Sequence, residues 1–350
     1  MQDMKKQSED VVAYKKHICL DARMYQHSGI GVYLLQLIHK IRSDKSVKLT
    51  LLVPELDIPE FKDIPQIELN APIYSIKEQL LYPLRIPACD IFWSPHYNMP
   101  ILPVRAKKRW VTIHDIYHLR FAHSLGWHER IYAKIFLSVA CRRSEKIFTV
   151  SNFSRKELLH FFSVNEKIQV VPNKVDIEKF SRQYPSPFSE TVLKKYQINF
   201  PYILFVGNVK PNKNLITLIK AFEKIQSRVD PVKLLIVGKK EGFIKNDNEV
   251  GQYLESHNEW MESIFFTGSV SHDELPIIYQ KASLFVFPSI YEGFGYPPLE
   301  ALAAGIPVLC SNADPMPEVC GDKVFYFPPK DIEQLSDLIL KHLIIQNVIS

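Results

Sequence analysis

Short apolar runs alternate along this chain with longer segments whose apolar residues recur at helical spacing. The apolar runs occupy residues 17–21, 47–53, 109–113, 146–150, 168–171, 202–206, 233–238, 264–268 and 284–287. Between them, segments such as 130–140, 215–225 and 332–345 follow a period near 3.6 residues, which predicts helices with one buried face. Buried strands that alternate with helices are typical of α/β proteins with parallel sheets. We therefore predict an α/β fold.

A proline- and serine-rich stretch, residues 181–201, separates two series of strands and helices. We interpret it as a linker, because such residues between periodic segments favour loops. The predicted domains are 1–185 and 186–350, each large enough to bury its own core. Residues 54–88 are expected to form irregular loops and short helices. Ligands of doubly wound sheets bind at the carboxyl ends of the strands, so we expect two Rossmann-like domains that face a central cleft.

The second domain contains a strand, a glycine loop and a helix in direct succession, within residues 284–306. Glycines allow backbone N–H groups to approach a phosphate, and the helix N-terminus adds partial positive charge. Glu292 before the loop and Glu300 in the predicted first turn of the helix can accept hydrogen bonds from hydroxyl groups. Taken singly, Glu300 could merely stabilise its helix end and Glu292 could be a solvated turn residue. Together they predict a sugar-nucleotide site.

The first domain offers weaker signals of the same kind. Gly29 and Gly31 stand between the first predicted strand and the first predicted helix, where they form either a phosphate loop or a tight turn. His114 and Asp115 follow the strand at residues 109–113, and the carboxyl end of a parallel strand faces the ligand crevice. These positions suit polar contacts with a ligand.

Charge is unevenly distributed along the chain. Residues 1–180 contain 27 Lys and Arg against 19 Asp and Glu, whereas residues 181–350 contain 16 against 19. Basic residues cluster at Arg105, Lys107, Lys108, Arg109, Arg142 and Arg143. Such a cluster is either an ordinary solvated surface or a contact for an anionic membrane surface or a phosphorylated lipid acceptor. No RNP-like, helix-turn-helix or zinc-finger pattern accompanies it, so we expect no nucleic-acid partner.

The start of the chain, MQDMKKQSED, is polar, and no apolar run approaches the ~18 residues of a spanning helix. We therefore expect a cytoplasmic protein, peripheral at the inner face of a membrane. Five cysteines form no CxxC pair and no metal-like spacing with histidine, so they are predicted to be buried reduced thiols, without structural zinc.

The string EGFGYPPLEALAAGIPV at residues 292–308 resembles the signature of family 4 glycosyltransferases of the GT-B fold, with its Glu-x7-Glu pair. Further similar elements are VTIHDIYHL at 111–119, PNKVD at 172–176 and GNVKPNKN at 207–214. The resemblance implies a retaining, metal-independent hexosyltransferase that needs no cofactor and moves a sugar from a nucleotide-sugar donor to an acceptor. Similarity to bacterial mannosyltransferases of surface polysaccharide synthesis, such as lipopolysaccharide, suggests GDP-mannose and a glycan or lipid-linked acceptor.

The same resemblance implies roles for individual residues. Glu292 would hold sugar hydroxyls and stabilise an oxocarbenium ion, and His114 would hold the donor sugar; these two are the predicted catalytic residues. The predicted donor-binding residues are Gly29, Gly31, Asn208, Lys213, Gly268, Val270, Gly293, Phe294, Gly295, Tyr296 and Glu300. Among them Lys213 would bind phosphate and Glu300 the ribose hydroxyls. Asp115 and Tyr117 are expected on the acceptor side.

Three departures from the family pattern keep other functions open. Asn208 stands where many members carry arginine, Lys174 stands where glycine is usual, and members usually continue into a helix that crosses back to the first domain. A catalytically impaired nucleotide-sugar-binding subunit, or an epimerase or phosphorylase of the same fold, therefore remains an alternative. A dinucleotide dehydrogenase is disfavoured, because neither glycine loop reads GxGxxG.

Overall fold

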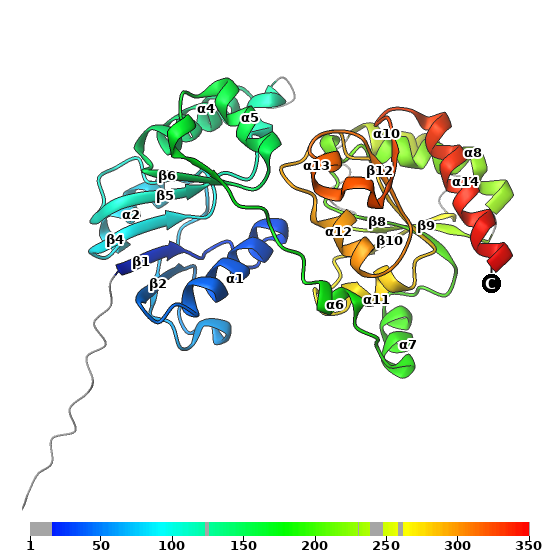
Figure 1. Ribbon diagram of the computed structural model, residues 1–350, viewed down its shortest axis with the longest axis horizontal. Coiled ribbons are helices and arrows are strands. Elements are labelled where there is room, and N and C mark those ends of the chain that lie inside the picture. Colours follow the sequence, from blue (N-terminus) through cyan, green and yellow to red (C-terminus); the bar gives the residue numbers. More distant parts are fainter. Residues whose placement is uncertain (1–15, 123–125, 230, 239–247, 258–261, 350) are drawn as a thin grey trace, which may run out of the picture. The chain divides into compact units, whose positions relative to one another are not determined.

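The structure is a computed structural model that describes residues 16–122, 126–229, 231–238, 248–257 and 262–349 (Figure 1). The chain folds into two compact units. The first unit comprises the chain up to Thr149 together with Arg155–Val171, and the second comprises Val150–Ser154 together with Pro172–Ser350. Each unit is built on a parallel sheet with helices on both faces, as the alternating pattern predicts.

The first unit contains a seven-stranded sheet in the order β3-β2-β1-β4-β5-β6-β7, in which every pairing is parallel. The strands are β1 (Lys16–Asp21), β2 (Val47–Val53), β3 (Gln66–Glu68), β4 (Cys89–Ser94), β5 (Ala106–Thr112), β6 (Lys146–Thr149) and β7 (Ile168–Val170). In the centre of the sheet, Ile18 pairs with Leu49 on one side and with Ile91 on the other. The strand order reverses direction beside β1, so the carboxyl ends of β1 and β4 flank the switch point where ligands of such sheets bind.

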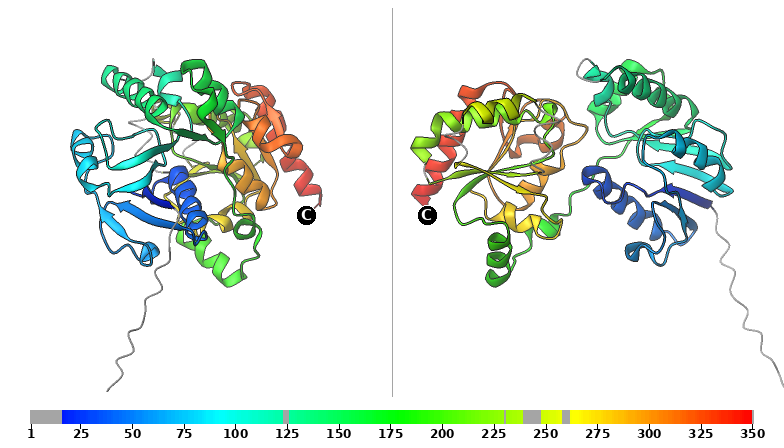
Figure 2. Two further views of the ribbon diagram at one scale, coloured as in Figure 1. Left: turned by 60° about the vertical axis from the view of Figure 1, so that its left-hand side comes forward. Right: turned by 180° about the vertical axis from the view of Figure 1, so that it is seen from behind.

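Helices cover both faces of this sheet (Figures 1 and 2). They are α1 (Ser28–Arg42), α2 (Ile76–Arg85), α3 (Tyr117–Arg120), α4 (Trp127–Arg143) and α5 (Asn152–Phe161), with the 3-10 turns η1 (Pro59–Phe61) and η3 (Asn165–Lys167). One face of the sheet packs on α1, whose Leu34 and Leu37 meet Leu20 of β1. The opposite face is covered by α2, whose buried Tyr82 packs beside Phe92, and by α4 and α5.

The second unit contains a six-stranded parallel sheet in the order β10-β9-β8-β11-β12-β13. The strands are β8 (Tyr202–Val206), β9 (Lys233–Val237), β10 (Ile264–Gly268), β11 (Leu284–Phe287), β12 (Val308–Ser311) and β13 (Phe325–Phe327). The helices are α6 (Ile177–Ser181), α7 (Ser186–Lys195), α8 (Leu215–Val229), α10 (Asn248–Ser256), α11 (Leu275–Gln280), α12 (Tyr296–Ala303), α13 (Met316–Cys320) and α14 (Ile332–Ile349), with the 3-10 turns η4 (Pro211–Lys213) and η6 (Gly321–Lys323).

Two apolar layers enclose this second sheet. On one face, α8 and α14 bury Phe222 and Leu335 against alternate residues of the strands, such as Phe205. On the other face, α6, α11 and α12 bury Phe180, Tyr279 and Ala301. Strand residues are buried on both faces, as expected for a parallel sheet between helices.

The region predicted as a linker is partly helical. Helix α7 occupies Ser186–Lys195, with Pro187 among its first two residues and Val192 buried. Proline is compatible with the first turn of a helix, where the missing N–H has no partner, so the prolines here mark a helix start. The preceding Phe180 is buried in the core of the second unit. Residues 172–185, which the sequence assigned to the first domain, accordingly pack with the second unit.

All five cysteines are buried free thiols, as predicted. Within the described ranges, no helix is long and apolar enough to cross a membrane.

Candidate functional site

The predicted site residues fall into both units. In the second unit, the glycine loop joins β11 to α12. Gly295 ends the loop as the N-cap of α12 with a φ of 97°, which side chains of L residues rarely allow. A Cβ at this position would also lie 2.6 Å from Cε of Met316. The backbone conformation therefore requires glycine, and a Cβ would in addition force the end of the Met316 side chain to move.

The start of α12 presents backbone N–H groups that have no protein acceptor. None of the described residues accepts a hydrogen bond from the N–H groups of Gly293, Phe294 or Gly295, although all three residues are buried. Tyr296, the first residue of the helix, is half-buried. Free N–H groups at a helix N-terminus favour a bound anion such as phosphate. This geometry is suited to the phosphate site that the sequence predicted.

Lys213 and Glu292, which are distant in the sequence, form an ion pair in the second unit. Lys213 Nζ lies 2.6 Å from Glu292 Oε1, and the two side chains are only 17% and 13% exposed. The Ser289 hydroxyl donates a hydrogen bond to the same carboxylate oxygen at 2.5 Å. Lys213 Nζ also stands over the ring of Phe287, 5.2 Å from its centroid. The predicted phosphate-binding cation therefore forms an ion pair with the predicted catalytic carboxylate.

Hydrogen bonds between two loops create this ion pair. The Asn212 side chain donates to the carbonyl of Tyr291 at 2.9 Å, and the Asn212 carbonyl accepts from the N–H of Ile290 at 2.8 Å. Asn214 has a left-handed backbone with a φ of 52° and donates through its side chain to the carbonyl of Pro288 at 3.0 Å. Asparagine tolerates this conformation better than most residues, which explains its use here. The segment 212–214 is thus tied to the segment 288–291.

Glu300 is buried, with 6% of its surface exposed, and the Tyr279 hydroxyl donates to its carboxylate at 2.9 Å. Burial raises the pKa of Glu300 to about 7, although the hydrogen bond from Tyr279 and the charge of Lys179 act in the opposite direction. Because α12 begins at Tyr296, Glu300 lies in the second turn, whereas we expected it in the first. The helix dipole acts mainly in the first turn, so helix stabilisation does not explain this buried carboxylate.

The remaining predicted donor-binding residues of the second unit lie at the carboxyl ends of β8 and β10. Asn208 is exposed in the loop that follows β8. Gly268 ends β10 with a φ of 72°, and its carbonyl accepts from the N–H of Gly238 at 3.1 Å. A Cβ on Gly238 would lie 2.4 Å from the carbonyl oxygen of Gly207. The backbone after β8 and the backbone after β9 therefore approach so closely that position 238 has no room for a side chain. Val270 follows as a half-buried residue.

In the first unit, His114 follows β5 and is held through its imidazole ring. Its Nε2 donates to the carbonyl of Pro95 at 2.9 Å, and its ring meets Tyr33 edge to face with centroids 4.8 Å apart. Burial lowers the pKa of His114, so the imidazole is neutral at physiological pH. A neutral ring with its proton on Nε2 can accept a hydrogen bond at Nδ1 but carries no charge toward a ligand.

Of the two residues predicted on the acceptor side, Tyr117 begins the short helix α3 and Asp115 lies two residues before it. One carboxylate oxygen of Asp115 accepts from the N–H of Tyr117 at 2.9 Å, as in an Asx turn. The Tyr117 ring stacks on Phe121 with centroids 5.0 Å apart. Both residues therefore have structural contacts at or near the start of α3.

Gly29 and Gly31 do not form a loop, because α1 already begins at Ser28. Gly31 is buried, and a Cβ there would lie 2.5 Å from the carbonyl oxygen of Tyr25. The glycine is required by this close backbone approach. Gly29 is exposed in the first turn of the helix.

Sequence reasoning missed a buried polar network beside the switch point of the first sheet. Arg23 donates through Nε and Nη2 to the two carboxylate oxygens of Asp21, at 2.9 and 2.6 Å, and through Nη2 to Glu78 at 2.6 Å. The Tyr82 hydroxyl lies within hydrogen-bond distance of both carboxylates, and the Asn98 side chain donates to Glu78. Burial alone would raise the pKa of Asp21, but Arg23 outweighs it and holds that pKa below its usual value. Asp21 ends a predicted strand, but nothing in the sequence indicates Glu78 as its neighbour.

Two buried donors of this network have no acceptor among the described residues, Arg23 Nη1 and His96 Nε2. Burial lowers the pKa of His96 to about 3, so the ring is neutral. Its Nδ1 accepts from the N–H of Asn98 at 3.2 Å, which places the ring proton on Nε2. The first unit thus keeps two unused N–H donors beside the carboxyl ends of β1 and β4.

A further contact that the sequence did not predict holds the glycine loop of the second unit through the carbonyl of Gly293. Ser151 and Ser154 donate through their hydroxyls to the carbonyl of Gly293, at 2.7 and 3.2 Å. Both serines belong to the short segment Val150–Ser154 that packs with the second unit. The carbonyl of the loop is therefore satisfied by protein groups, while the neighbouring N–H groups are left for a ligand.

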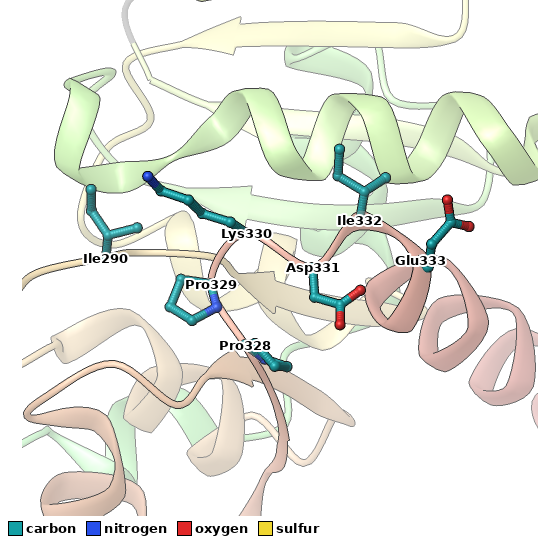
Figure 3. A pocket seen from close by; sticks show the side chains of 7 residues that line it. All are labelled: Ile290, Pro328, Pro329, Lys330, Asp331, Ile332 and Glu333. Atoms are coloured by element: carbon teal, nitrogen blue, oxygen red, sulfur yellow. The ribbon is translucent and has the colours of Figure 1, made fainter.

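A hollow of about 760 Å³ adjoins the same region (Figure 3). Its lining consists of Ile290, Pro328, Pro329, Lys330, Asp331, Ile332 and Glu333. Figure 3 shows the Lys330 side chain extending towards Ile290, the neighbour of the ion-paired loop. The hollow includes no predicted site residue. In the described part of the chain, no group of three or more His, Cys, Asp or Glu side chains is arranged to hold a metal ion.

Comparison with known proteins covers most of the chain. A family model described as Glycosyltransferase Family 4 matches residues 27–179, and one described as Glycosyl transferases group 1 matches residues 189–347. O-antigen chain mannosyltransferase B of Escherichia coli is 29% identical, over 91% of this chain and 88% of that protein. O-antigen chain mannosyltransferase RfbU of Salmonella typhimurium is 31% identical, over 70% of this chain and 65% of that protein.

Solved structures share the fold at low identity. HepE of Anabaena, in complex with UDP and glucose, superposes with a TM-score of 0.71 at 18% identity, over 93% of this chain and 89% of that one. WaaG, a glycosyltransferase involved in lipopolysaccharide biosynthesis, gives a TM-score of 0.71 at 17% identity, over 93% of this chain and 90% of that one. The two Rossmann-like units are those of a GT-B fold.

Proposed function

Because this chain belongs to the family 4 glycosyltransferases, we propose that it transfers mannose from GDP-mannose to a glycan or lipid-linked acceptor. A glycosyltransferase with a nucleotide-sugar donor is what the family itself implies. The choice of mannose is supported by two relatives named as O-antigen mannosyltransferases, at 29% and 31% identity. The GN-x-x-P-x-KN loop at residues 207–214 supports the same choice.

The observation that carries the proposal is the meeting of Lys213, Glu292 and the free N–H groups of Gly293–Gly295 in one unit. A departing nucleoside diphosphate develops negative charge that the enzyme must stabilise in place. One lysine, three N–H groups and a helix N-terminus would provide that stabilisation, so we propose a reaction that needs no metal or other cofactor. Glu300 would accept hydrogen bonds from the ribose hydroxyls.

The proposed reaction is a retaining substitution. The bond between the anomeric carbon and the β-phosphate oxygen breaks, and an acceptor hydroxyl oxygen attacks from the same face of the sugar. The hydroxyl proton passes to the leaving phosphate. Glu292 would hold sugar hydroxyls and stabilise the oxocarbenium character of the transition state, and neutral His114 would bind the donor sugar.

In the proposed reaction, donor binding exchanges the ion pair between Lys213 and Glu292. Lys213 and Glu292 lie 2.6 Å apart, so a diphosphate competes with the carboxylate for the lysine. Once Lys213 binds phosphate, the Glu292 carboxylate is free to accept hydrogen bonds from the sugar. We propose that this exchange couples recognition of the diphosphate to the readiness of the catalytic carboxylate.

The proposal also includes a location. We propose that the protein works on the cytoplasmic side of a membrane, bound peripherally, where a lipid-linked acceptor would be available. The positive charge of residues 1–180, a net +8, supports contact with an anionic surface.

A panel of nucleotide sugars tests the proposal by thermal unfolding. A ligand that binds only the folded protein raises the melting temperature by mass action, so GDP-mannose should raise it more than UDP-glucose or ADP-glucose. The matched variant is Glu300→Ala, which removes the carboxylate that would accept hydrogen bonds from the ribose hydroxyls. This variant should show no rise in melting temperature with GDP-mannose. No shift with any nucleotide sugar would contradict the proposal. A shift without sugar release or transfer would instead favour the nucleotide-sugar-binding subunit, and product analysis would identify an epimerase.

A further inference from the structure

Two helices of the first unit expose apolar side chains at helical spacing. On α2, Ile76, Leu80 and Leu84 are 82%, 59% and 78% exposed. On α4, Trp127, Ile131 and Ile135 are 74%, 51% and 47% exposed. Each set follows an i, i+4, i+8 pattern, so each forms one stripe along its helix. Apolar residues scattered singly over a surface are normal, whereas two ordered stripes indicate an interaction site.

Both stripes belong to the same layer of the unit. The inward sides of α2 and α4 pack on one face of the seven-stranded sheet, through buried Tyr82 and Leu137. The rings of Tyr74, just before α2, and Tyr132 of α4 meet edge to face with centroids 5.6 Å apart. Asn98 donates to Glu78 of α2 and accepts from Tyr132 of α4, so the first turn of α2 lies close to α4. Their outward sides therefore form one surface, which we call the α2/α4 surface, and the exposed side of α4 continues into Arg142.

At its basic end this surface contains a groove of about 740 Å³. The groove is lined by Ile101, Leu102, Pro103, Ala106, Lys107, Lys108, Arg109, Arg142, Arg143, Ser144, Glu145 and Lys167. Six of these side chains are cationic and one is acidic. The groove adjoins the start of β5, whereas His114 follows the end of that strand. It is therefore separate from the candidate catalytic site.

Most of the positive charge in the groove is not neutralised by nearby carboxylates. Lys107 pairs with Asp90 and Lys108 with Glu145, at 2.7 and 2.8 Å. In contrast, Arg109 donates to the carbonyls of Pro100 and Leu102, and Arg143 and Lys167 also donate to backbone carbonyls. Burial and the neighbouring charge of Arg143 lower the pKa of Arg109, so an anion bound between them would relieve repulsion.

We propose that the α2/α4 surface docks the protein on an anionic phospholipid bilayer. The two apolar stripes would enter the boundary between headgroups and acyl chains, and the basic groove would receive lipid phosphates. Charge complementarity selects this occupant, because ordered apolar residues beside concentrated Lys and Arg match an anionic interface. This inference rests on the proposed function in one respect, namely that a lipid-linked acceptor would be found at a membrane surface. It adds the residues through which the protein would dock there.

Vesicle flotation with the full-length protein tests the proposal. Vesicles of phosphatidylcholine mixed with phosphatidylglycerol should carry the protein upward, vesicles of phosphatidylcholine alone should carry much less, and added salt should release it. Arg142→Gln with Arg143→Gln should weaken partitioning by about fivefold for each arginine at low salt. Trp127→Ser with Ile131→Ser should weaken it by about tenfold or more, and this loss should persist at high salt.

Matched substitutions on exposed residues of the second unit serve as controls. Lys194→Gln with Lys281→Gln, and Ile177→Ser with Phe188→Ser, should leave flotation unchanged, since these residues lie outside the α2/α4 surface. All variants should keep the wild-type melting temperature and the thermal shift with GDP-mannose. If wild type floats with anionic vesicles but shows no thermal shift with GDP-mannose, the proposed donor is wrong and the docking proposal is still supported.

Three results would overturn the docking proposal. The first is flotation that the α2/α4 substitutions do not reduce. The second is equal binding to neutral and anionic vesicles. The third is a stable dimer in sedimentation experiments that the Trp127→Ser and Ile131→Ser changes dissociate, because the surface would then be covered by a second copy of the chain.

Discussion

At the scale of single residues, the candidate site depends on groups that would be costly in an ordinary protein core. Glu300 is a buried carboxylate that accepts a hydrogen bond from the hydroxyl of Tyr279, and Gly295 has a backbone conformation that other residues rarely adopt. Such costs persist where the surrounding structure holds the residue in place, and they are concentrated at functional sites. Both residues were selected from the sequence, yet burial and backbone conformation became known only from the structure.

Glu300→Gln tests the cost of the buried carboxylate. Because the pKa of Glu300 is about 7 in the folded protein against 4.5 in the unfolded chain, its favourable contribution is complete below the unfolded value. That contribution is lost as the pH rises through about 7. The variant should therefore gain about 3 kcal/mol of unfolding free energy over wild type in mildly alkaline solution, and little in acid. Urea unfolding of both proteins across this pH range measures the difference, and a pH-independent difference would contradict the assigned pKa.

Gly295→Ala tests the second cost, with Gly305→Ala as its matched control. Both glycines have positive φ, 97° and 80°, but only Gly295 has atoms of Met316 within reach of a new Cβ. Each change should cost about 1 kcal/mol or more for the backbone, and Gly295→Ala should cost about 0.5–1.5 kcal/mol further if Met316 must leave its preferred rotamer. Equal losses in chemical denaturation would show that Met316 moves aside freely.

At the scale of elements, strands were predicted well because parallel strands are buried on both faces and read as continuous apolar runs. Short edge strands such as β3 and β13 lack such runs, and they were missed. Helix α7 was read as a linker because its prolines resemble a loop, although they stand at its N-terminus. The sequence predicts either a phosphate loop or a tight turn at Gly29-x-Gly31, yet both glycines lie in the first turn of α1, where Gly31 packs against the backbone of Tyr25. Lys174 does not adopt a positive φ, so its turn is not strained.

The polar contacts of the site could not be predicted, because they join segments far apart in the sequence. Asp21 and Glu78 share Arg23, and Gly293 is held by two serines from residues 150–154. Each contact depends on where two loops meet above the strands. Apolar periodicity predicts the order of the strands and helices, but it carries no information about which polar side chains contact one another across the loops.

Glu292→Gln tests the ion pair that joins two of these loops. Removal of the carboxylate leaves Lys213 without its partner, so a nucleoside diphosphate no longer competes with Glu292. A partly buried pair of this kind is worth on the order of 1 kcal/mol, so GDP should bind about fivefold more tightly to the variant. Isothermal titration calorimetry with GDP measures this affinity, with Ser289→Ala as a variant that keeps both charges. Weaker GDP binding to Glu292→Gln would argue against the exchange.

At the scale of the whole molecule, the predicted site residues are divided between the two units. The second unit contains the phosphate loop, Lys213, Glu292 and Glu300, while the first contains His114. The fold and the family account for this division, since each Rossmann-like sheet presents ligand groups at the carboxyl ends of its strands. The α2/α4 surface adds a third region, with a separate task that vesicle binding can test independently of catalysis.

The most direct test of the central claim is transfer of radiolabelled mannose from GDP-mannose by the purified protein. The assay supplies a lipid extract of bacterial membranes as the acceptor source and contains EDTA. We predict that label enters the lipid or glycan fraction with wild type, and that Glu292→Gln lowers this transfer by about a hundredfold. Absence of transfer from every nucleotide sugar that the protein binds would contradict the account, as would transfer that Glu292→Gln leaves unchanged.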